Sequence, residues 1–190
     1  FLFLLVSYLV QNNIGNIDDY IVEGYFGALM FIFIEITATV FAPISAIPLL
    51  PLMSEKYGWF IAGLLSIVGW TIGSVIAFLI ARKYGSPLVR KLISLEKISE
   101  IEKRIPETNL FWSIVFFRMI LPVDILSYIL GLFSRIKFNT YFWATLIGIS
   151  PFAFILAYLG TLPLYYQISF FITGMLILVL GYLLYKKKTI

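Results

Sequence analysis

The stretch LFWSIVFFRMILPVDILSYILGLF, residues 110–133, decides how this chain can lie in a membrane. It is apolar and long enough to cross a hydrocarbon core of roughly 30 Å, yet Arg118, Pro122 and Asp124 stand near its middle. Proline removes a backbone donor and clashes with the preceding helical turn. Irregular backbone at membrane depth is tolerated only where protein or a water-filled cavity surrounds it. The stretch therefore predicts a hairpin that dips into the membrane and returns.

The composition of the whole chain agrees with a membrane location. Hydrophobic residues make up 61% of the 190 positions and charged residues 13%, and a soluble domain of this length has no interior large enough for so many apolar side chains. Three further apolar blocks, 59–81, 141–162 and 168–185, are each about long enough to span a bilayer. We therefore predict an all-α integral membrane protein.

Missing residue types exclude several kinds of chemistry. The chain has no Cys and no His, which excludes thiolate metal sites, cysteine nucleophiles and Ser-His triads. It has no glycine-rich loop for ATP phosphates, and Asp124 is the only Asp in an apolar block, where an intramembrane aspartyl protease needs two. We expect no enzyme activity, no cofactor and no metal. The net charge of +4 does not indicate nucleic-acid binding, because the basic residues flank the spans.

Basic residues indicate which loops face the cytoplasm. Most of the 14 Lys and Arg residues lie in the segment 82–104, the linker 134–139 and the tail 186–188. By the positive-inside rule, all three segments are cytoplasmic. The cytoplasmic basic residues that we single out are Arg82, Lys83, Arg90 and Lys91. We expect a multi-pass protein of a prokaryotic plasma membrane, with the 82–109 loop and the C-terminus inside.

Parity gives the number of crossings between these segments. Three apolar blocks separate the basic loop from the basic tail, so one block must return to the side from which it came, and 110–133 is the candidate. The upstream block 20–53 must begin and end outside, and Pro43, Pro48 and Pro51 interrupt it. We predict that this block is a second re-entrant hairpin, which enters from the opposite face.

The two hairpins, each followed by a span, form units of opposite orientation. This is the inverted-repeat plan of many secondary transporters, in which interrupted helices meet near the midplane. We expect a single membrane domain that also has a partial N-terminal helix, an amphipathic cytoplasmic helix and a C-terminal transmembrane helix. Its predicted parts are 1–19, the first unit 20–81, the cytoplasmic segment 82–109, the second unit 110–162, and the last span with the basic tail, 163–190.

Three ionisable residues inside the apolar blocks are the candidate site for substrate and protons: Glu35, Arg118 and Asp124. Charge at that depth is costly unless it is paired or faces water. If the hairpins meet at the midplane, Arg118 can face both carboxylates. Protonation of Glu35 or Asp124 would then leave Arg118 able to hold a phosphate headgroup, helped by the N-termini of broken helices. The alternative is an ion pair that is purely structural.

Glycine, proline and tyrosine residues are assigned structural roles. Small residues let helices approach closely in lipid, and those expected to do so are Gly69, Gly73 and Gly85. The residues expected to shape the re-entrant loops are Pro43, Pro48, Pro122, Tyr128 and Gly131.

Two of these stretches resemble the signatures of a known family. Residues 117–131, FRMILPVDILSYILG, resemble the signature of the DedA and SNARE-associated Golgi protein family, which is also called the VTT domain family. Residues 69–85, GWTIGSVIAFLIARKYG, are similar to its other common pattern. The resemblance covers roughly residues 35–160, about two thirds of the chain.

This resemblance implies two facing re-entrant loops and movement of lipid between leaflets. Bacterial members of the family are linked to the return of polyprenyl phosphate carriers and to the proton-motive force, and eukaryotic members to phospholipid scrambling. Glu35 and Arg118 match functional residues of the bacterial group. The chain departs from the bacterial pattern at Ile47, where a second acid is usual, and at Asp124, where a second arginine is usual.

Three functions remain open. The first is a flippase or scramblase that moves phospholipid or polyprenyl-phosphate lipids between leaflets, with or without coupling to protons. The second is a proton-coupled transporter or exchanger of a small ion or solute, and the third is a scaffold that recruits partners through its cytoplasmic helix. The expected partners are membrane lipids with anionic or phosphate-bearing headgroups, and protons, whereas the sequence leaves the oligomeric state open.

Overall fold

The computed structural model of the chain is helical in the part that it describes, which is residues 2–12, 24–41, 45–85, 110–120, 123–133 and 136–188. Its helices are α1 (Leu2–Gln11), α2 (Gly24–Val40), η2 (Ile47–Leu49), α3 (Leu50–Tyr57), α4 (Trp59–Ile80), η3 (Ala81–Gly85), α7 (Leu110–Ile120), α8 (Val123–Phe133), α9 (Phe138–Thr161) and α10 (Leu164–Lys188). Three stretches are long and apolar enough to cross a membrane: Trp59–Gly85, Phe138–Thr161 and Leu164–Gly181. These findings confirm the prediction of an all-α integral membrane protein.

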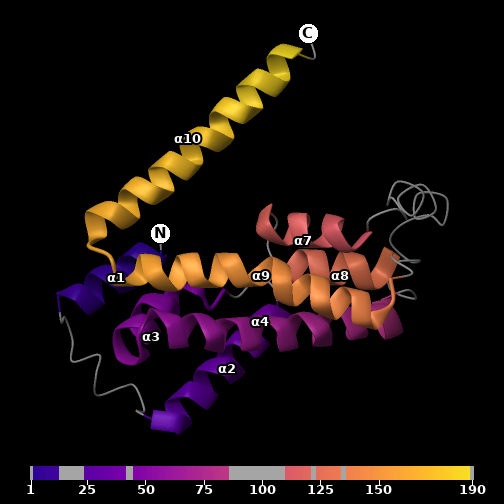
Figure 1. Cartoon of the computed structure of the whole chain (residues 1–190), viewed down its shortest axis with the longest axis horizontal. Coiled ribbons are helices and arrows are strands. Elements are labelled where there is room, and N and C mark those ends of the chain that lie inside the picture. The colour runs from indigo at the N-terminus through magenta and orange to yellow at the C-terminus, as the bar shows by residue number, and fades with distance from the viewer. Residues whose placement is uncertain are drawn as a thin grey trace.

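The long helices α4 and α9 lie side by side at the centre and run antiparallel (Figure 1). At one end the rings of Trp59 and Tyr158 are 5.7 Å apart, and towards the other end the rings of Phe78 and Tyr141 stack at 3.9 Å. Between these points the backbone at Gly63 lies against the ring of Phe154, where a Cβ would have no room. The pair therefore forms the frame on which the shorter helices pack.

In the first half, α2 and α3 are two arms on either side of a break. The arm α2 runs parallel to α4, because Glu35 lies against Gly69 and Thr39 lies against Gly73, one turn further along both helices. Tyr57, the last residue of α3, donates a hydrogen bond to the carbonyl of Gly24, the first residue of α2, at 2.9 Å. The chain therefore returns at the end of α3 to the place where α2 began.

The break and the turn after it follow local sequence rules. Pro48 stands in the first turn of η2, where a missing backbone N–H leaves no hydrogen bond unmade. Gly58 joins α3 to α4 with φ of +78°, a left-handed conformation that glycine adopts without steric cost. The return arm extends to Tyr57, four residues beyond the predicted end of the hairpin, because the turn needs a glycine and the chain supplies it at 58.

The second half repeats this arrangement with α7, α8 and α9. The arm α7 packs on α9, where Gly148 lies against the carbonyl of Val115. The arm α8 crosses to α4, where a Cβ at Gly131 would lie 2.5 Å from the carbonyl oxygen of Phe78. The arm α3 makes the corresponding crossing to α9, where Gly160 abuts Pro51. In each half, the first arm thus packs on its own long helix and the second arm on the long helix of the other half.

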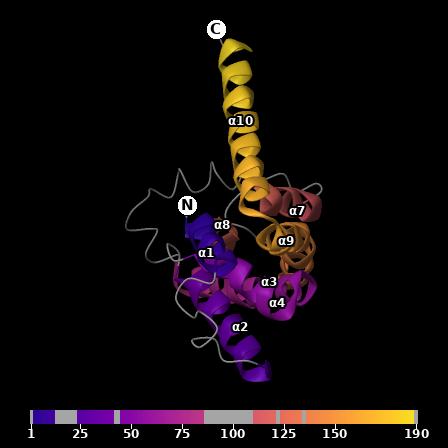
Figure 2. The same cartoon turned by 90° about the vertical axis from the view of Figure 1, so that its left-hand side faces the viewer.

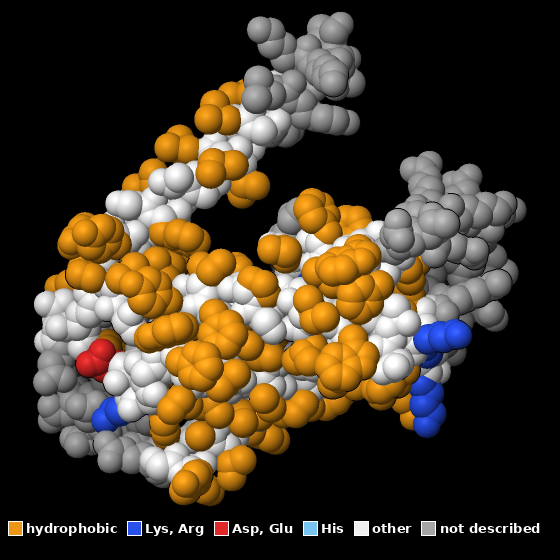
Figure 3. Space-filling model, viewed as in Figure 1, with side chains coloured by type: hydrophobic (Ala, Val, Ile, Leu, Met, Phe, Trp, Pro, Cys, Tyr) orange, Lys and Arg blue, Asp and Glu red, His pale blue; other side chains and the backbone are white. Residues whose placement is uncertain are grey.

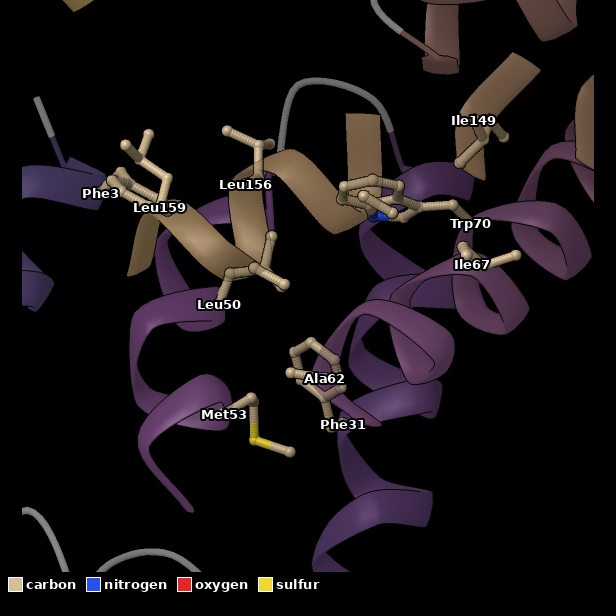
Figure 4. Close-up of a cluster of buried hydrophobic side chains, with 12 residues drawn as sticks. Phe3, Phe31, Leu50, Met53, Ala62, Ile67, Trp70, Ile149, Leu156 and Leu159 are labelled. Carbon is tan, nitrogen blue, oxygen red and sulfur yellow. The ribbon is translucent and has the colours of Figure 1, made fainter. Parts of the chain in front are cut away.

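Two clusters of buried hydrophobic side chains hold these helices together. Figure 4 shows the larger cluster, to which α1, α2, α3, α4 and α9 all contribute; its labelled residues are Phe3, Phe31, Leu50, Met53, Ala62, Ile67, Trp70, Ile149, Leu156 and Leu159. The second joins α4, α7, α8 and α9, with Phe78, Ile114, Val115, Leu126, Leu130, Tyr141 and Ala144. Each cluster includes residues of both long helices, so the two halves share their hydrophobic core.

The helices α1 and α10 attach at one end of this bundle. Gln167 in the first turn of α10 donates to Ser7 of α1 at 2.5 Å and to the carbonyl of Leu162 at 2.8 Å. Beyond this joint α10 leaves the bundle (Figures 1 and 2). Only 6% of its most apolar window is buried, against 56% for Trp59–Gly85. Nearly all of its described surface is therefore left for contacts outside this chain.

The outer surface has the charge pattern of a membrane protein. The visible face is apolar along the helices, and charged groups lie at its two ends (Figure 3). Glu55 and Lys56 lie at the end of α3, whereas Arg82, Lys83 and Lys137 lie where α4 ends and α9 begins. The predicted cytoplasmic cations that the structure describes, Arg82 and Lys83, thus share one end with the basic linker. Arg90 and Lys91 lie outside the described residues, as does most of the predicted amphipathic helix.

Candidate functional site

Glu35 is fully buried in the contact between α2 and α4. One carboxylate oxygen accepts a short hydrogen bond from the indole N–H of Trp70, and the other lies 3.5 Å from the hydroxyl of Ser66. Gly69 makes this contact possible, because its backbone lies directly against the Glu35 side chain. Burying a carboxylate is costly unless hydrogen-bond donors replace the lost water. The span α4 supplies such donors from one face, at Ser66 and one turn later at Trp70.

Arg118 is 2% exposed and lies where α7 meets α8 and α9. One terminal nitrogen of its guanidinium donates to three hydroxyl oxygens: those of Ser127 at 3.0 Å, Tyr141 at 2.7 Å and Thr145 at 3.2 Å. These three partners are neutral hydroxyl groups, which accept hydrogen bonds from the guanidinium. The arrangement is a cation held in place by hydroxyl groups from two helices.

The two buried charges occupy matching positions in the two halves. Glu35 lies against Gly69 of α4, and Arg118 lies against Gly148 of α9. A Cβ added at each glycine would also meet the carbonyl oxygen of the residue three positions before the charged one, Ile32 at 3.3 Å or Val115 at 3.0 Å. The hydroxyl that contacts each charge comes three residues before the glycine, from Ser66 and Thr145. The same local packing thus holds an acid in one half and a base in the other.

The third predicted site residue, Asp124, belongs to α8, but its side chain lies outside the described residues. The described contacts of Glu35 are made to α4, whereas those of Arg118 are made to α8 and α9. The prediction that Arg118 faces both carboxylates is therefore not tested by the structure. Among the described residues, no group of three or more acidic side chains is placed to hold a metal ion.

Several predicted structural residues lie at the contacts between helices. Tyr128 of α8 donates to the carbonyl of Val40, the last residue of α2, at 2.5 Å. The last carbonyls of a helix have no partner within it, so this hydroxyl caps α2 and joins the arms of the two halves. A side chain at Gly85 would overlap Leu132 of α8, and Gly73 lies against Thr39 of α2. Pro43 and Pro122 lie outside the described residues.

The sequence did not indicate five residues that contact the buried charges: Ser66, Trp70, Ser127, Tyr141 and Thr145. One signal could have found two of the contacts. The pattern hydroxyl-x-x-Gly occurs in both long helices, at Ser66–Gly69 and at Thr145–Gly148. A hydroxyl three residues before a close-packed glycine lies on the same face of the helix, so it is directed at whatever the glycine approaches. The ring partners could not be found in this way, because their contacts depend on how the helices pack.

These features define an integral membrane protein whose buried acid and base are typical of membrane transport proteins. The family model of the VTT domain matches residues 34–162. The chain therefore belongs to the VTT domain family, the family of the DedA and SNARE-associated Golgi proteins, which is a membrane family commonly linked to transport. The match confirms the resemblance drawn from residues 69–85 and 117–131. Comparisons with curated proteins and with solved structures found no match.

Proposed function

We propose that this chain moves lipids between the two leaflets of a membrane, along a path between two re-entrant hairpins. The hairpins are α2 with α3, and α7 with α8. They belong to two units of opposite orientation, so they enter from opposite faces and approach one another at mid-depth. The substrate is a phospholipid or a polyprenyl-phosphate lipid, whose charged headgroup needs a polar route while its acyl chains stay in the bilayer.

Two contacts support the hairpin arrangement. The hydrogen bond from Tyr57 to Gly24 brings the end of the first hairpin back to its start. The cap that Tyr128 places on the end of α2 brings the turn regions of the two hairpins together. A backbone break at membrane depth is stable when it is enclosed by protein, and each second arm is enclosed by the long helix of the other half.

The observation that carries the proposal is the pair of buried charges, Glu35 and Arg118, at equivalent positions beside the breaks. A buried ion pair adds little to the stability of the fold, because desolvation offsets most of the attraction between its charges. A charge inside the membrane is by contrast useful for holding a headgroup. The match in local packing indicates that both positions are shaped for a charged side chain.

Arg118 is the residue that we assign to the phosphate. A guanidinium binds phosphate through parallel N–H donors, and its planar fork fits two phosphate oxygens at once. A guanidinium binds an anionic phosphate more strongly than a neutral hydroxyl group, so a phosphate can displace the hydroxyl groups that accept from Arg118. Glu35 balances the charge of Arg118 when no anion is bound, and uptake of a proton by Glu35 restores the balance when an anion arrives. This step makes transport proton-linked.

Flux in liposomes tests the proposal. Purified protein is reconstituted with labelled phospholipid or labelled polyprenyl phosphate, with and without a pH gradient, and the label that reaches the other leaflet is measured. We expect Arg118→Gln to abolish movement of both lipids and Glu35→Gln to remove the effect of the gradient. Lys83→Gln is the matched control, because Lys83 is an exposed cation at the end of α4.

Other outcomes of the same assay point to other functions. Lipid flux that is unchanged in Arg118→Gln contradicts the proposal. Liposomes that move no lipid, but acidify in response to an added solute in an Arg118-dependent manner, indicate a proton-coupled solute transporter. A protein that is inactive in both assays, and whose cellular role survives Arg118→Gln but not damage to the predicted cytoplasmic helix within residues 82–109, indicates a scaffold.

A further inference from the structure

One ridge along α4 contacts Glu35 directly and Arg118 through Tyr141 of α9. Five residues at successive four-residue steps form this ridge: Ser66, Trp70, Ser74, Phe78 and Arg82. Residues four apart lie above one another on a helix, so the ridge is continuous over about 24 Å. The first two residues hold the Glu35 carboxylate. We call this set the α4 ridge.

Tyr141 of α9 joins the other end of the α4 ridge to Arg118. Its hydroxyl accepts from Arg118 at 2.7 Å and donates to the backbone carbonyl of Ser74 at 2.9 Å. Its ring stacks on Phe78 at 3.9 Å between centroids, and the Phe78 ring in turn carries the Arg82 guanidinium at 4.3 Å. Tyr141 thus contacts the ridge twice, through its hydroxyl and through its ring.

On the α4 ridge, the residue that contacts Glu35 and the residue that contacts Tyr141 are only one helical turn apart. Trp70 donates to Glu35, and Ser74, four residues later, accepts from Tyr141. The residues that form the connection are 5% exposed or less, and close-packed interiors transmit small displacements because they have no slack. A movement of the Tyr141 hydroxyl therefore displaces the helical turn that carries the Trp70 indole.

The same turn has polar atoms that can change partners. Within the described part of the chain, the hydroxyl oxygens of Thr71 and Ser74 are buried and have no hydrogen-bond partner. An unsatisfied buried hydroxyl is costly, so a rearrangement that gives it a partner is favoured. The Ser74 hydroxyl belongs to the residue whose carbonyl already accepts from Tyr141. The junction therefore has a second arrangement available when Arg118 turns towards an anion.

We propose that Tyr141 is a positioning residue that couples an anion bound at Arg118 to the Glu35 carboxylate through the α4 ridge. The inference rests on the proposed function, in which Arg118 holds the phosphate of a lipid. An anion that draws the guanidinium away from the Tyr141 hydroxyl shifts the Ser74 turn, and the shift changes how Trp70 holds Glu35. Because coupling is reciprocal, a change at Glu35 must alter the affinity of the anion at Arg118.

A double-mutant cycle with a phosphate probe tests this coupling. Dioctanoyl-phosphatidylglycerol is titrated into the protein in neutral detergent by calorimetry, and dioctanoylglycerol, which lacks the phosphate, is the ligand control. We expect Glu35→Gln to change the dissociation constant by at least about fivefold when Tyr141 is present, and by less than about twofold in the Tyr141→Phe background. Tyr141→Phe keeps the ring on Phe78 and removes only the hydroxyl. Tyr158→Phe, on the same helix and 51% exposed, is the matched control and should leave the fivefold change intact.

The fluorescence of Trp70 provides a second measurement. It would not depend on the Tyr141 hydroxyl if Tyr141 had only a structural role. The other three tryptophans, Trp59, Trp112 and Trp143, are exposed, so replacing them by Phe leaves Trp70 as the single reporter. We expect the probe to shift the Trp70 emission in this variant. With Tyr141→Phe added, the probe should still bind but the emission should not respond.

The possible failures are distinguishable. If the probe does not bind the unmodified protein, or binds Arg118→Gln equally well, the proposed function is wrong. If binding depends on Arg118 but the effect of Glu35→Gln persists without the Tyr141 hydroxyl, the two charges interact through space and the inference alone is wrong. If Tyr141→Phe abolishes binding as completely as Arg118→Gln does, Tyr141 only holds Arg118 in place, which also overturns the inference.

Discussion

A methyl group added at Gly69 tests how closely the helix that carries Glu35 must approach α4. An ideal Cβ at this position lies 2.5 Å from the Glu35 Cβ and 3.3 Å from the carbonyl oxygen of Ile32. Carbon atoms pack at about 3.5–4.0 Å, so Gly69→Ala requires α2 and α4 to separate by about 1 Å. Both neighbouring atoms are fixed to the backbone of α2, so no rotation of a side chain relieves the overlap.

The expected magnitude follows from this overlap and from a matched control. Overpacking of this kind costs about 1–3 kcal/mol. Gly174 in α10 has nothing within 4 Å of its ideal Cβ, so Gly174→Ala should gain about 0.5–1 kcal/mol from helix propensity alone. A change of 1 kcal/mol moves the melting midpoint of a chain of this size by about 2–4 °C. We therefore expect Gly69→Ala to melt about 2–12 °C lower, and Gly174→Ala no lower, than the parent protein.

Thermal unfolding in neutral detergent and lipid flux in liposomes measure the two consequences. Separation of the helices also draws Glu35 away from its donors on α4, so flux should fall together with stability in Gly69→Ala. Flux should be unchanged in Gly174→Ala. If Gly69→Ala melts as high as Gly174→Ala and transports at the parent rate, the close contact between α2 and α4 is not part of the working protein.

Two further substitutions and one double-mutant cycle test the site. Trp70→Phe removes the indole donor from the buried Glu35 carboxylate and should lower stability by about 1–3 kcal/mol, measured by thermal unfolding with Trp143→Phe as the control. Tyr128→Phe removes the hydrogen bond between α8 and the end of α2. We expect a loss of about 0.5–1.5 kcal/mol of stability and faster lipid flux, because the hairpins then separate more readily. In a double-mutant cycle, we expect the effects of Glu35→Gln and Arg118→Gln on the free energy of unfolding to be non-additive, because the two charges compensate one another. Additive effects would show that the two charges lie in independent pockets.

Much of the helix pattern could be predicted from the sequence, because proline and charge interrupt apolar blocks at few places. Pro48 marks the start of η2, and the long apolar runs after Trp59 and before Pro163 became α4 and α9. Boundaries were less certain. The predicted last span began at Ile168, whereas α10 begins at Leu164, because the joint after α9 is only two residues long. An apolar block by itself does not show where its first turn starts.

The partners of the buried charges could not be predicted, because they come from other helices of the same half, whose packing a single sequence does not show. Periodicity places Ser66 and Trp70 on one face of a helix, but it does not say which helix lies opposite. The packing of α2 on α4, and of α7 on α9, decides this, and it depends on whole helices. The stacking of Tyr141 on Phe78 is hidden for the same reason, since aromatic residues make up 18% of the chain and offer many alternative pairs.

The two halves share the packing around their buried charges, but the charges have opposite signs. Packing is shared, since a glycine and a hydroxyl three residues before it surround both Glu35 and Arg118. Two bases at these positions would repel one another in a low-dielectric interior, and two acids would repel a phosphate. In the proposed function, the charges of Glu35 and Arg118 balance at rest, and an anion that binds at Arg118 upsets that balance. A repeat with one charge of each sign can therefore link the binding of an anion in one half to a change of charge in the other.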